Sequence, residues 1–326
     1  MSGAAYYYRV YLPGHSAVRE FAYVLPASVS VLDSRAEIHL VIGILKNGDR
    51  VEVLSRDGDW ARVHLASGLK GWIQADDLTD ARAYEEGRRL LKDMEGLPPQ
   101  AAGHTSFKVN LRLEPSRDAS VLAQIPQNQR LEVYGRRLIA READAPESGG
   151  ESAGAGKEKP APEAARREAW YLVRADSRAG WVYGRLVSLD IPEEIGDYAE
   201  STNTVAWLVL NTVEDDGRKV PQYLVADRTV TPDYDFDRIR VFTWWATENH
   251  YATAYIESRL NGYFPIRVVS DGDSSFFRLR LVDKKGRNVQ KIYQLSNTIV
   301  RPIGTVEGWL SDALPAAPAA RTRRQR

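Results

Sequence analysis

Apolar and polar residues alternate along much of this chain, as they do in strands that are buried on one face. In residues 60–65, Ala61, Val63 and Leu65 occupy every second position. Successive side chains of a strand point to opposite faces, so these three residues predict one buried face and place Trp60 on the other. Similar runs recur to about residue 295, and we predict a mainly β protein.

One pattern occurs twice. Residues 29–53 match residues 109–133 without a gap, and "RVEV" at Arg50 corresponds to "RLEV" at Arg130. Gly48 then corresponds to Asn128, and these are the two residue types that best adopt a left-handed turn conformation. The internal match predicts two β units with the same backbone, at residues 22–79 and 105–190.

The second unit contains an insertion. Trp60 corresponds to Trp170, so about 30 additional residues separate the matching strands of the second copy. Residues 141–167 are rich in Gly, Ala, Pro and Glu and contain almost no large apolar residue. Such a segment cannot bury enough surface to offset its ordering entropy, so we predict a disordered loop at the tip of a hairpin.

Two further segments complete the chain, between predicted tails at 1–21 and 304–326. Residues 80–104 contain a stripe of Tyr84, Gly87, Leu91 and Met94, which predicts a linker helix that packs against one β unit. The segment 203–303 is β-rich, with turn sequences between its strands, and predicts an antiparallel sandwich or barrel. Its seven predicted strands are 204–213, 221–227, 238–245, 251–258, 262–269, 274–283 and 288–295.

Composition narrows the possible functions. The 326 residues include 44 Lys plus Arg and 44 Asp plus Glu, so no net charge favours nucleic acid as a partner. The chain has no Cys, which excludes thiolate nucleophiles and disulfides, and it has no apolar run long enough to span a membrane. Tyrosines stand where a signal peptide would have its apolar core, so we expect an unusual or misassigned start.

No motif predicts catalysis or metal binding. Residues 150–154 match G-x-S-x-G, but they lie in the low-complexity insertion without the strand and helix that a nucleophile requires. Asp233, Asp235 and Asp237 resemble the start of a calcium loop, but the required Gly and Glu are missing, and we interpret them as acidic turn residues. The five histidines have no metal-ligand spacing. We predict no enzyme activity, no cofactor and no metal.

Aromatic residues are the remaining candidates for ligand contacts. Tryptophans recur at equivalent places in the two units, and each either packs in a core or contacts a ligand. Trp244 and Trp245 are adjacent in a predicted strand, so one of them must leave the core side of the sheet. The candidate ligand-binding residues are Trp60, Trp72, Arg112, Tyr134, Trp170, Trp181, Tyr183 and Trp245.

The two units resemble bacterial SH3 (SH3b) domains. Each has a Trp-x-x-Val motif followed by Gly-Trp, at Trp60 and Trp72 in the first unit and at Trp170 and Trp181 in the second. The second unit keeps the family's Leu-Arg pair with Arg112, whereas the first unit has Leu32 at that position. The whole arrangement is similar to uncharacterised bacterial SH3b-containing proteins, often lipoproteins, that end in a β-domain.

This resemblance implies two small SH3-like β-barrels, a short linker helix and a C-terminal antiparallel β-sandwich or barrel. It also implies a setting in the bacterial cell envelope, but no activity. We predict a non-enzymatic binding or scaffold protein there, with peptidoglycan stem peptides or an envelope protein as partner. An accessory or regulatory subunit in the cytoplasm is the alternative. The sequence leaves the oligomeric state open, and it favours the second unit as the main ligand module.

Overall fold

A computed structural model describes residues 20–140, 167–199, 204–229, 234–271 and 274–309. The predicted disorder of the insertion lies outside these residues, as do most of both predicted tails. The chain divides into two compact units, one formed by Met1–Val24 with Ser28–Ala81 and the other by Leu25–Ala27 with Arg82–Arg326. No helix among the described residues is long and apolar enough to cross a membrane.

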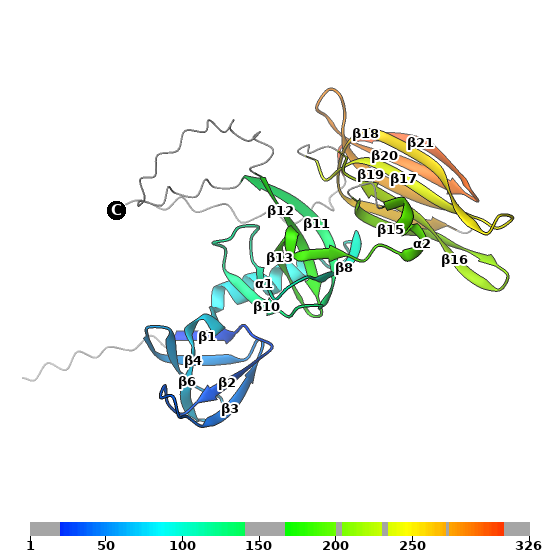
Figure 1. The fold of residues 1–326 in the computed structure, drawn as a ribbon. Helices are drawn as coiled ribbons and strands as arrows, with labels where there is room; N and C mark the ends of the chain where they lie inside the picture. The colour runs from blue at the N-terminus through cyan, green and yellow to red at the C-terminus, as the bar shows by residue number, and fades with distance from the viewer. Residues whose placement is uncertain (1–19, 141–166, 200–203, 230–233, 272–273, 310–326) are drawn as a thin grey trace, which may run out of the picture. The chain divides into compact units, whose positions relative to one another are not determined.

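The first unit contains one seven-stranded antiparallel sheet, which we call the first module (Figure 1). Its strand order is β3-β2-β6-β5-β4-β1-β7. The strands are β1 (Glu20–Val24), β2 (Ser28–Leu32), β3 (Val41–Lys46), β4 (Arg50–Asp57), β5 (Trp60–His64), β6 (Lys70–Gln74) and β7 (Leu78–Asp80), with a short 3-10 helix, η1 (Ala75–Asp77). Ala61 and Val63 are fully buried in its core, as the alternation predicts.

Helix α1 (Ala81–Asp93) follows the first module along the chain, and all of it except Ala81 belongs to the second unit. A second seven-stranded sheet, the second module, comes next. Its order, β10-β9-β13-β12-β11-β8-β14, repeats the order of the first module strand for strand. The strands are β8 (Ala101–Thr105), β9 (Val109–Arg112), β10 (Val121–Ile125), β11 (Arg130–Ala140), β12 (Arg167–Ala175), β13 (Arg178–Tyr183) and β14 (Val187–Leu189), with η3 (Gly184–Leu186) before β14.

Equivalent positions of the two modules share unusual backbone features. Gly48 has φ +85° and Asn128 has φ +60°, so the predicted left-handed turn is confirmed in both. A Cβ atom on Gly71 would lie 2.7 Å from the carbonyl oxygen of Leu32, and one on Gly180 would lie 2.8 Å from that of Arg112. Two strands therefore approach closely at the same place in each module.

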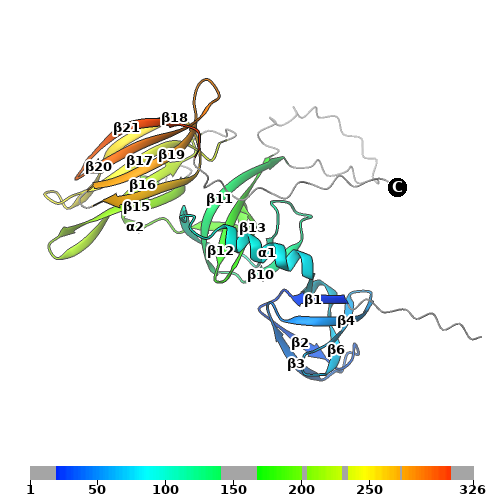
Figure 2. The same ribbon diagram turned by 180° about the vertical axis from the view of Figure 1, so that it is seen from behind.

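Helix α1 packs against the second module, as the stripe in the linker predicts (Figure 2). Its buried residue Leu90 and the following Met94 form one cluster with Tyr134, Trp170 and Trp181. The helix ends before Gly96, whose φ of +80° suits glycine. The linker thus supplies part of the hydrophobic packing of the second module.

The C-terminal sheet is a seven-stranded meander in which each strand pairs with the next along the chain. Its strands are β15 (Thr204–Asp215), β16 (Arg218–Asp227), β17 (Phe236–Trp245), β18 (His250–Asp271), β19 (Ser274–Val282), β20 (Asn288–Ser296) and β21 (Ile299–Glu307). All seven strands contribute to one core. β15 also contacts β18 and β19, which are not its ladder neighbours, so the sheet folds over on itself.

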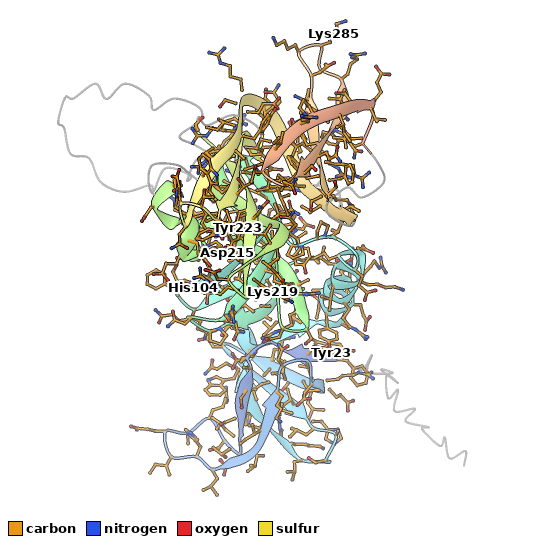
Figure 3. All side chains as sticks on the ribbon, turned by 90° about the vertical axis from the view of Figure 1, so that its right-hand side faces the viewer. Tyr23, His104, Asp215, Lys219, Tyr223 and Lys285 are labelled. Atoms are coloured by element: carbon orange, nitrogen blue, oxygen red, sulfur yellow. The ribbon has the colours of Figure 1, made fainter. Side chains whose placement is uncertain are left out.

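The other face of this sheet carries helix α2 (Glu193–Ala199). Ile195 of the helix packs with Tyr223, Phe242 and Tyr251, and Tyr223 is labelled in Figure 3. The hydroxyl group of Tyr198 donates to the carbonyl oxygen of Tyr251 at 2.8 Å. The C-terminal sheet is therefore buried on part of both faces.

Gln100 joins the second module to the C-terminal sheet. It is completely buried, and its carbonyl oxygen accepts a hydrogen bond from the backbone N–H of Trp207 at 2.9 Å. Its side-chain amide makes two hydrogen bonds to the backbone of Ile266. Buried amide hydrogen bonds of this kind fix one geometry, because breaking them leaves polar groups unsatisfied.

The mainly β fold class is confirmed: the described residues form three antiparallel sheets with few helices, consistent with SH3-like domains and a β-sandwich. None of these three sheets is a closed barrel. Four local predictions were wrong. The predicted strands 251–258 and 262–269 are one strand, β18, and the predicted C-terminal tail begins inside β21. Strand β8 lies mostly in the segment 80–104, which was predicted to be a linker. The short helix α2 was not predicted.

Candidate ligand-binding groove

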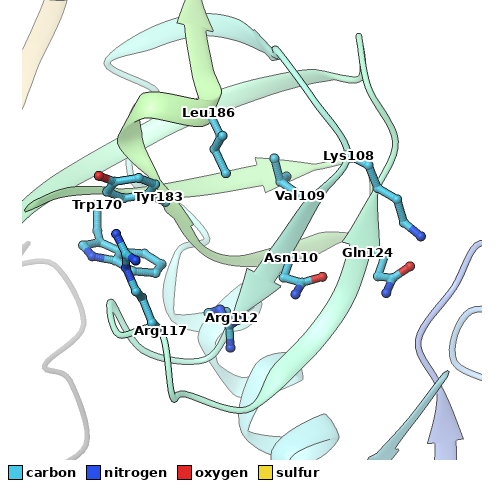
Figure 4. A pocket seen from close by; sticks show the side chains of 9 residues that line it. All are labelled: Lys108, Val109, Asn110, Arg112, Arg117, Gln124, Trp170, Tyr183 and Leu186. Carbon is cyan, nitrogen blue, oxygen red and sulfur yellow. The ribbon is translucent and has the colours of Figure 1, made fainter. Parts of the chain in front are cut away.

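An open groove lies on the second module, between the β9–β10 loop, β12 and η3 (Figure 4). Its volume is about 460 Å³. Three of the residues predicted to contact a ligand meet there: Arg112, Trp170 and Tyr183. The complete lining is Lys108, Val109, Asn110, Arg112, Arg117, Gln124, Trp170, Tyr183 and Leu186.

Two aromatic rings form one wall of the groove. Trp170 and Tyr183 are cross-strand partners on β12 and β13, with ring centroids 5.7 Å apart and planes tilted by 51°. Trp170 is 3% exposed, because it also belongs to the cluster under α1, whereas Tyr183 is half-buried. The half-buried Tyr183 ring is therefore the part of this wall that presents a rigid apolar surface to a ligand at low entropy cost.

A bidentate ion pair positions Arg117 beside this wall. Its guanidinium donates two hydrogen bonds to the carboxylate of Glu168, and this pairing raises the pKa of Arg117. The guanidinium carbon lies 5.3 Å from the centroid of the Tyr183 ring. Glu168 therefore offsets the charge of Arg117 and holds it against the aromatic wall.

Two other cations line the groove. Nη1 of Arg112 donates to the carbonyl oxygen of Ala119 at 2.6 Å, which anchors the side chain to the β9–β10 loop. Partial burial lowers the pKa of Arg112, and the nearby carboxylate of Asp118 opposes that effect. Lys108 is exposed and makes no hydrogen bond or ion pair with the residues that the structure describes.

Side-chain amides complete the polar floor. Asn110 and Gln124 are direct partners in the β9–β10 ladder. Within the described part of the chain, neither side chain makes a hydrogen bond. The lining contains cations, amides and apolar groups but no carboxylate and no histidine. This set can bind a ligand through charge, hydrogen bonds and apolar contact.

Four residues that line the groove were not among the predicted ligand-binding residues: Lys108, Asn110, Arg117 and Gln124. Lys108, Asn110 and Arg112 occupy alternate positions, separated by the buried Val109 and Leu111. This alternation predicts that Lys108 and Asn110 lie on the same face as Arg112, so these two residues could have been found from the sequence. The positions of Arg117 and Gln124 depend on how the β9–β10 loop and β10 fold back over β9, which no local pattern encodes.

The structure places two other predicted contact residues outside the groove. Tyr134 and Trp181 are each 2% exposed and lie in the cluster with α1. The hydroxyl group of Tyr134 donates to Glu132 at 2.7 Å, and burial raises the pKa of Tyr134. These two residues pack in the hydrophobic interior, because the linker helix covers the face that a single β unit would leave open.

The remaining predicted residues belong to other sheets. Trp60 and Trp72 are half-buried in the first module, where the guanidinium of Arg35 lies 4.5 Å from the Trp72 ring. Trp245 of the C-terminal sheet is 51% exposed, whereas Trp244 is half-buried and donates to Asp215 at 2.8 Å. The prediction that one residue of this pair leaves the core side is confirmed.

The first module has different chemistry at the positions equivalent to the groove. Leu32 pairs with Trp72 in the ladder, just as Arg112 pairs with Trp181 in the second module. Ile44 pairs with Ser30, as Gln124 pairs with Asn110, and Ile44 is 66% exposed. The same strand geometry thus carries aliphatic residues in one module and a cation and an amide in the other.

Comparison with known proteins identifies part of the first module. Residues 39–79 match the family described as "Bacterial SH3 domain". No curated protein matches the chain at a significant level. The match to residues 39–79 is evidence for a bacterial SH3 domain in the first module.

Solved structures give weaker likenesses. NlpC2 from Trichomonas vaginalis is 10% identical, with a TM-score of 0.18, and the match covers 89% of this chain and 97% of that protein. An NlpC/P60 family protein from Bacillus cereus is 9% identical, with a TM-score of 0.22, and the match covers 83% of this chain and 93% of that protein. Similarity at these TM-scores carries no argument about fold or activity.

Proposed function

We propose that this protein is a non-enzymatic binding protein of the bacterial cell envelope, and that the groove of the second module binds stem peptides of peptidoglycan. We also propose that the second module is a bacterial SH3 domain, so that the chain carries two in tandem. The identical strand order of the two modules supports this assignment.

One observation carries the proposed function: Arg112, Trp170 and Tyr183 meet at one open groove. A peptide of the cell wall presents aliphatic groups, amides and carboxylates. The aromatic wall complements the first, Asn110 and Gln124 complement the second, and Arg112 and Lys108 complement the third. The groove lining contains cations, amides and aromatic rings but no carboxylate and no histidine, which supports binding rather than catalysis.

Co-sedimentation with purified cell-wall sacculi tests this function. We expect wild type to sediment, and we expect Tyr183→Ala to weaken binding about 5- to 30-fold, which is typical for the loss of an aromatic anchor. Trp245→Ala is the matched control, because Trp245 is exposed and belongs to another sheet. Melting temperatures should stay within a few degrees of wild type for both variants.

Trp170→Ala is unsuitable for this binding test. Trp170 is 3% exposed, and truncation of a buried Trp costs about 3–5 kcal/mol of stability. Loss of binding in that variant would therefore not separate a contact from a folding defect. Failure of wild type itself to sediment with sacculi would overturn the proposed function.

A second candidate function is that of an accessory subunit that binds a protein in the cytoplasm. The first module favours it, because large aliphatic residues are exposed in and before its edge strand β3. These residues are Ile38, Leu40, Val41 and Ile44, with exposed fractions of 92%, 69%, 56% and 66%. Contiguous exposed apolar surface often marks a protein interface.

Fractionation of cells that express the natural gene separates the two candidates. The proposed envelope function requires the protein in the envelope fraction. Recovery in the cytosolic fraction, together with no binding to sacculi, would favour the accessory subunit instead.

A further inference from the structure

We infer that the groove of the second module selects a stem peptide through a free carboxylate, which Arg112 and Lys108 bind together. This inference rests on the proposed function and names the ligand group that the groove recognises. The inference follows from a comparison of the three cations of the groove: which of them is paired with a carboxylate, and which still has N–H donors available for a ligand.

The three cations of the groove differ in this respect. Glu168 accepts two hydrogen bonds from Arg117 and balances its positive charge, so Arg117 adds little net charge to the groove. Arg112 uses one Nη atom to hold the carbonyl oxygen of Ala119, and a guanidinium has five N–H donors in total. Lys108 has three donors, and none of them contacts a described residue.

Arg112 is the last residue of β9, and Lys108 immediately precedes that strand. Each lies two positions from Asn110, and all three residues line the groove. Alternate residues of a strand are about 7 Å apart, so an anionic group over Asn110 lies within reach of both long side chains. Asp118 is the carboxylate close to Arg112, and it lies on the loop rather than in the groove lining. The groove therefore keeps a surplus of positive charge.

The first module lacks this charge. The residues equivalent to Lys108, Arg112 and Gln124 are Ser28, Leu32 and Ile44. The strand order and the close-approach glycine are the same in both modules, so the fold does not require cations at these positions. Cations at the positions of Lys108 and Arg112 therefore occur in the second module and not in the first, and they favour an anionic ligand at the groove.

The aromatic wall limits the form of that ligand. Trp170 and Tyr183 lie at the other end of the groove from Lys108 (Figure 4). A ligand that spans the groove needs a carboxylate at one end and an apolar or methyl-bearing part at the other. A stem peptide of alternating alanine and dicarboxylic residues satisfies both requirements.

Two peptides of equal length test the inference with the full chain. The first is a synthetic stem tetrapeptide with free carboxylates, and the second is its twin in which every carboxylate is a primary carboxamide. Quenching of tryptophan fluorescence reports binding. We expect wild type to bind the carboxylate form at least 10-fold more tightly than its twin, and we expect that preference to decrease between 50 and 500 mM NaCl.

Variants locate the preference. Arg112→Gln should reduce it to less than about 3-fold, and Lys108→Gln should reduce it by a smaller factor. Arg130→Gln is the matched control: it removes the same charge from an exposed residue outside the groove, and it should keep the full preference. If Arg112→Gln is destabilised, Lys108→Gln and the salt dependence still decide the question.

Each outcome has a defined meaning. Equal affinity of wild type for the two peptides would overturn the inference while binding to sacculi upholds the proposed function. Binding of neither peptide, with no sedimentation on sacculi, would overturn both. Equally tight binding of an acidic hexapeptide of glutamate would overturn the assignment to a stem peptide.

Discussion

Asp235 is a buried carboxyl group in the turn before β17. Its Oδ2 accepts a hydrogen bond from the backbone N–H of Phe264 at 2.9 Å, and its own N–H donates to the carbonyl oxygen of Gly262 at 2.8 Å. Burial raises the pKa of Asp235 to about 6, although this hydrogen bond and Arg136 act in the opposite direction. Asp235 is the turn residue that the sequence predicts, and it is buried and joins β17 to β18.

The pKa of Asp235 predicts a pH dependence of stability. Between its unfolded value of 3.8 and about 6, the folded protein holds a proton that the unfolded chain has released. The contribution of Asp235 to the free energy of unfolding is therefore largest below about pH 4 and decreases as the pH rises to about 6. Above that pH it stays constant. Each pKa unit corresponds to about 1.4 kcal/mol, so the total change is at most a few kcal/mol.

Urea unfolding at several pH values measures this effect. In Asp235→Asn the amide can still accept the N–H of Phe264 but cannot ionise. The free-energy difference between wild type and Asp235→Asn should change between pH 4 and 6 and stay level between pH 7 and 8. A difference that is constant over the whole range would contradict the assignment.

At the scale of elements, the hairpin of β11 and β12 shows how the second module accommodates its insertion. The two strands pair as far as Ala140 and Arg167. The insertion therefore connects two strand ends that the ladder already holds together.

Replacement of residues 141–166 by a short Gly-Ser turn should leave the melting temperature within a few degrees of wild type. Loop-closure entropy changes only slowly with loop length, and no described core residue is lost. A control deletion from Arg137 to Trp170 removes a buried aromatic residue and should abolish cooperative unfolding of the second module. Similar losses in the two deletions would show that the insertion itself stabilises the fold.

Elements were predictable where the local pattern and the packing agree. Ala61 and Val63 alternate because one face of β5 meets the core. The predicted break between strands 251–258 and 262–269 was wrong because Gly262 resembles a turn residue. It lies inside β18, where a Cβ atom would come 2.2 Å from the Phe236 ring. β21 was missed because Pro302 disfavours a strand interior, yet an edge strand tolerates proline.

The candidate site was predictable only in part. Arg112 and Trp170 follow from the repeat and from the resemblance to SH3b domains. The burial of Tyr134 and Trp181 does not, since it depends on where α1 packs. The amphipathic stripe of α1 predicts that the helix packs on a β unit, but it does not specify which face of which unit.

At the scale of the whole molecule, the two units have separate cores. The core of the first module draws only on residues of its own sheet and the connections between its strands. The second module and the C-terminal sheet share the buried Gln100, and Trp207 packs against the core of the second module. We therefore expect the first unit to unfold separately from the second.

Calorimetry of glycine variants tests this expectation. Gly71→Ala should lower only the transition of the first unit, and Gly180→Ala only that of the second, because each new Cβ would meet a backbone oxygen that cannot move aside. Overpacking of this kind costs about 1–3 kcal/mol. Gly196→Ala, in α2 with no atom within 4 Å of its Cβ, is the control and should be neutral or slightly stabilising. A shift of both transitions by one variant would contradict the separation.

The packing of α1 on Trp181 and Tyr134 has a consequence for how this protein was assembled in evolution. A gene segment that encoded only the second sheet would yield a module with two large aromatic residues facing water. Transfer of this module between proteins is therefore productive only if the helix travels with it. The segment that keeps these two rings covered is the pair of helix and sheet, which begins at Ala81 rather than at the first strand, β8.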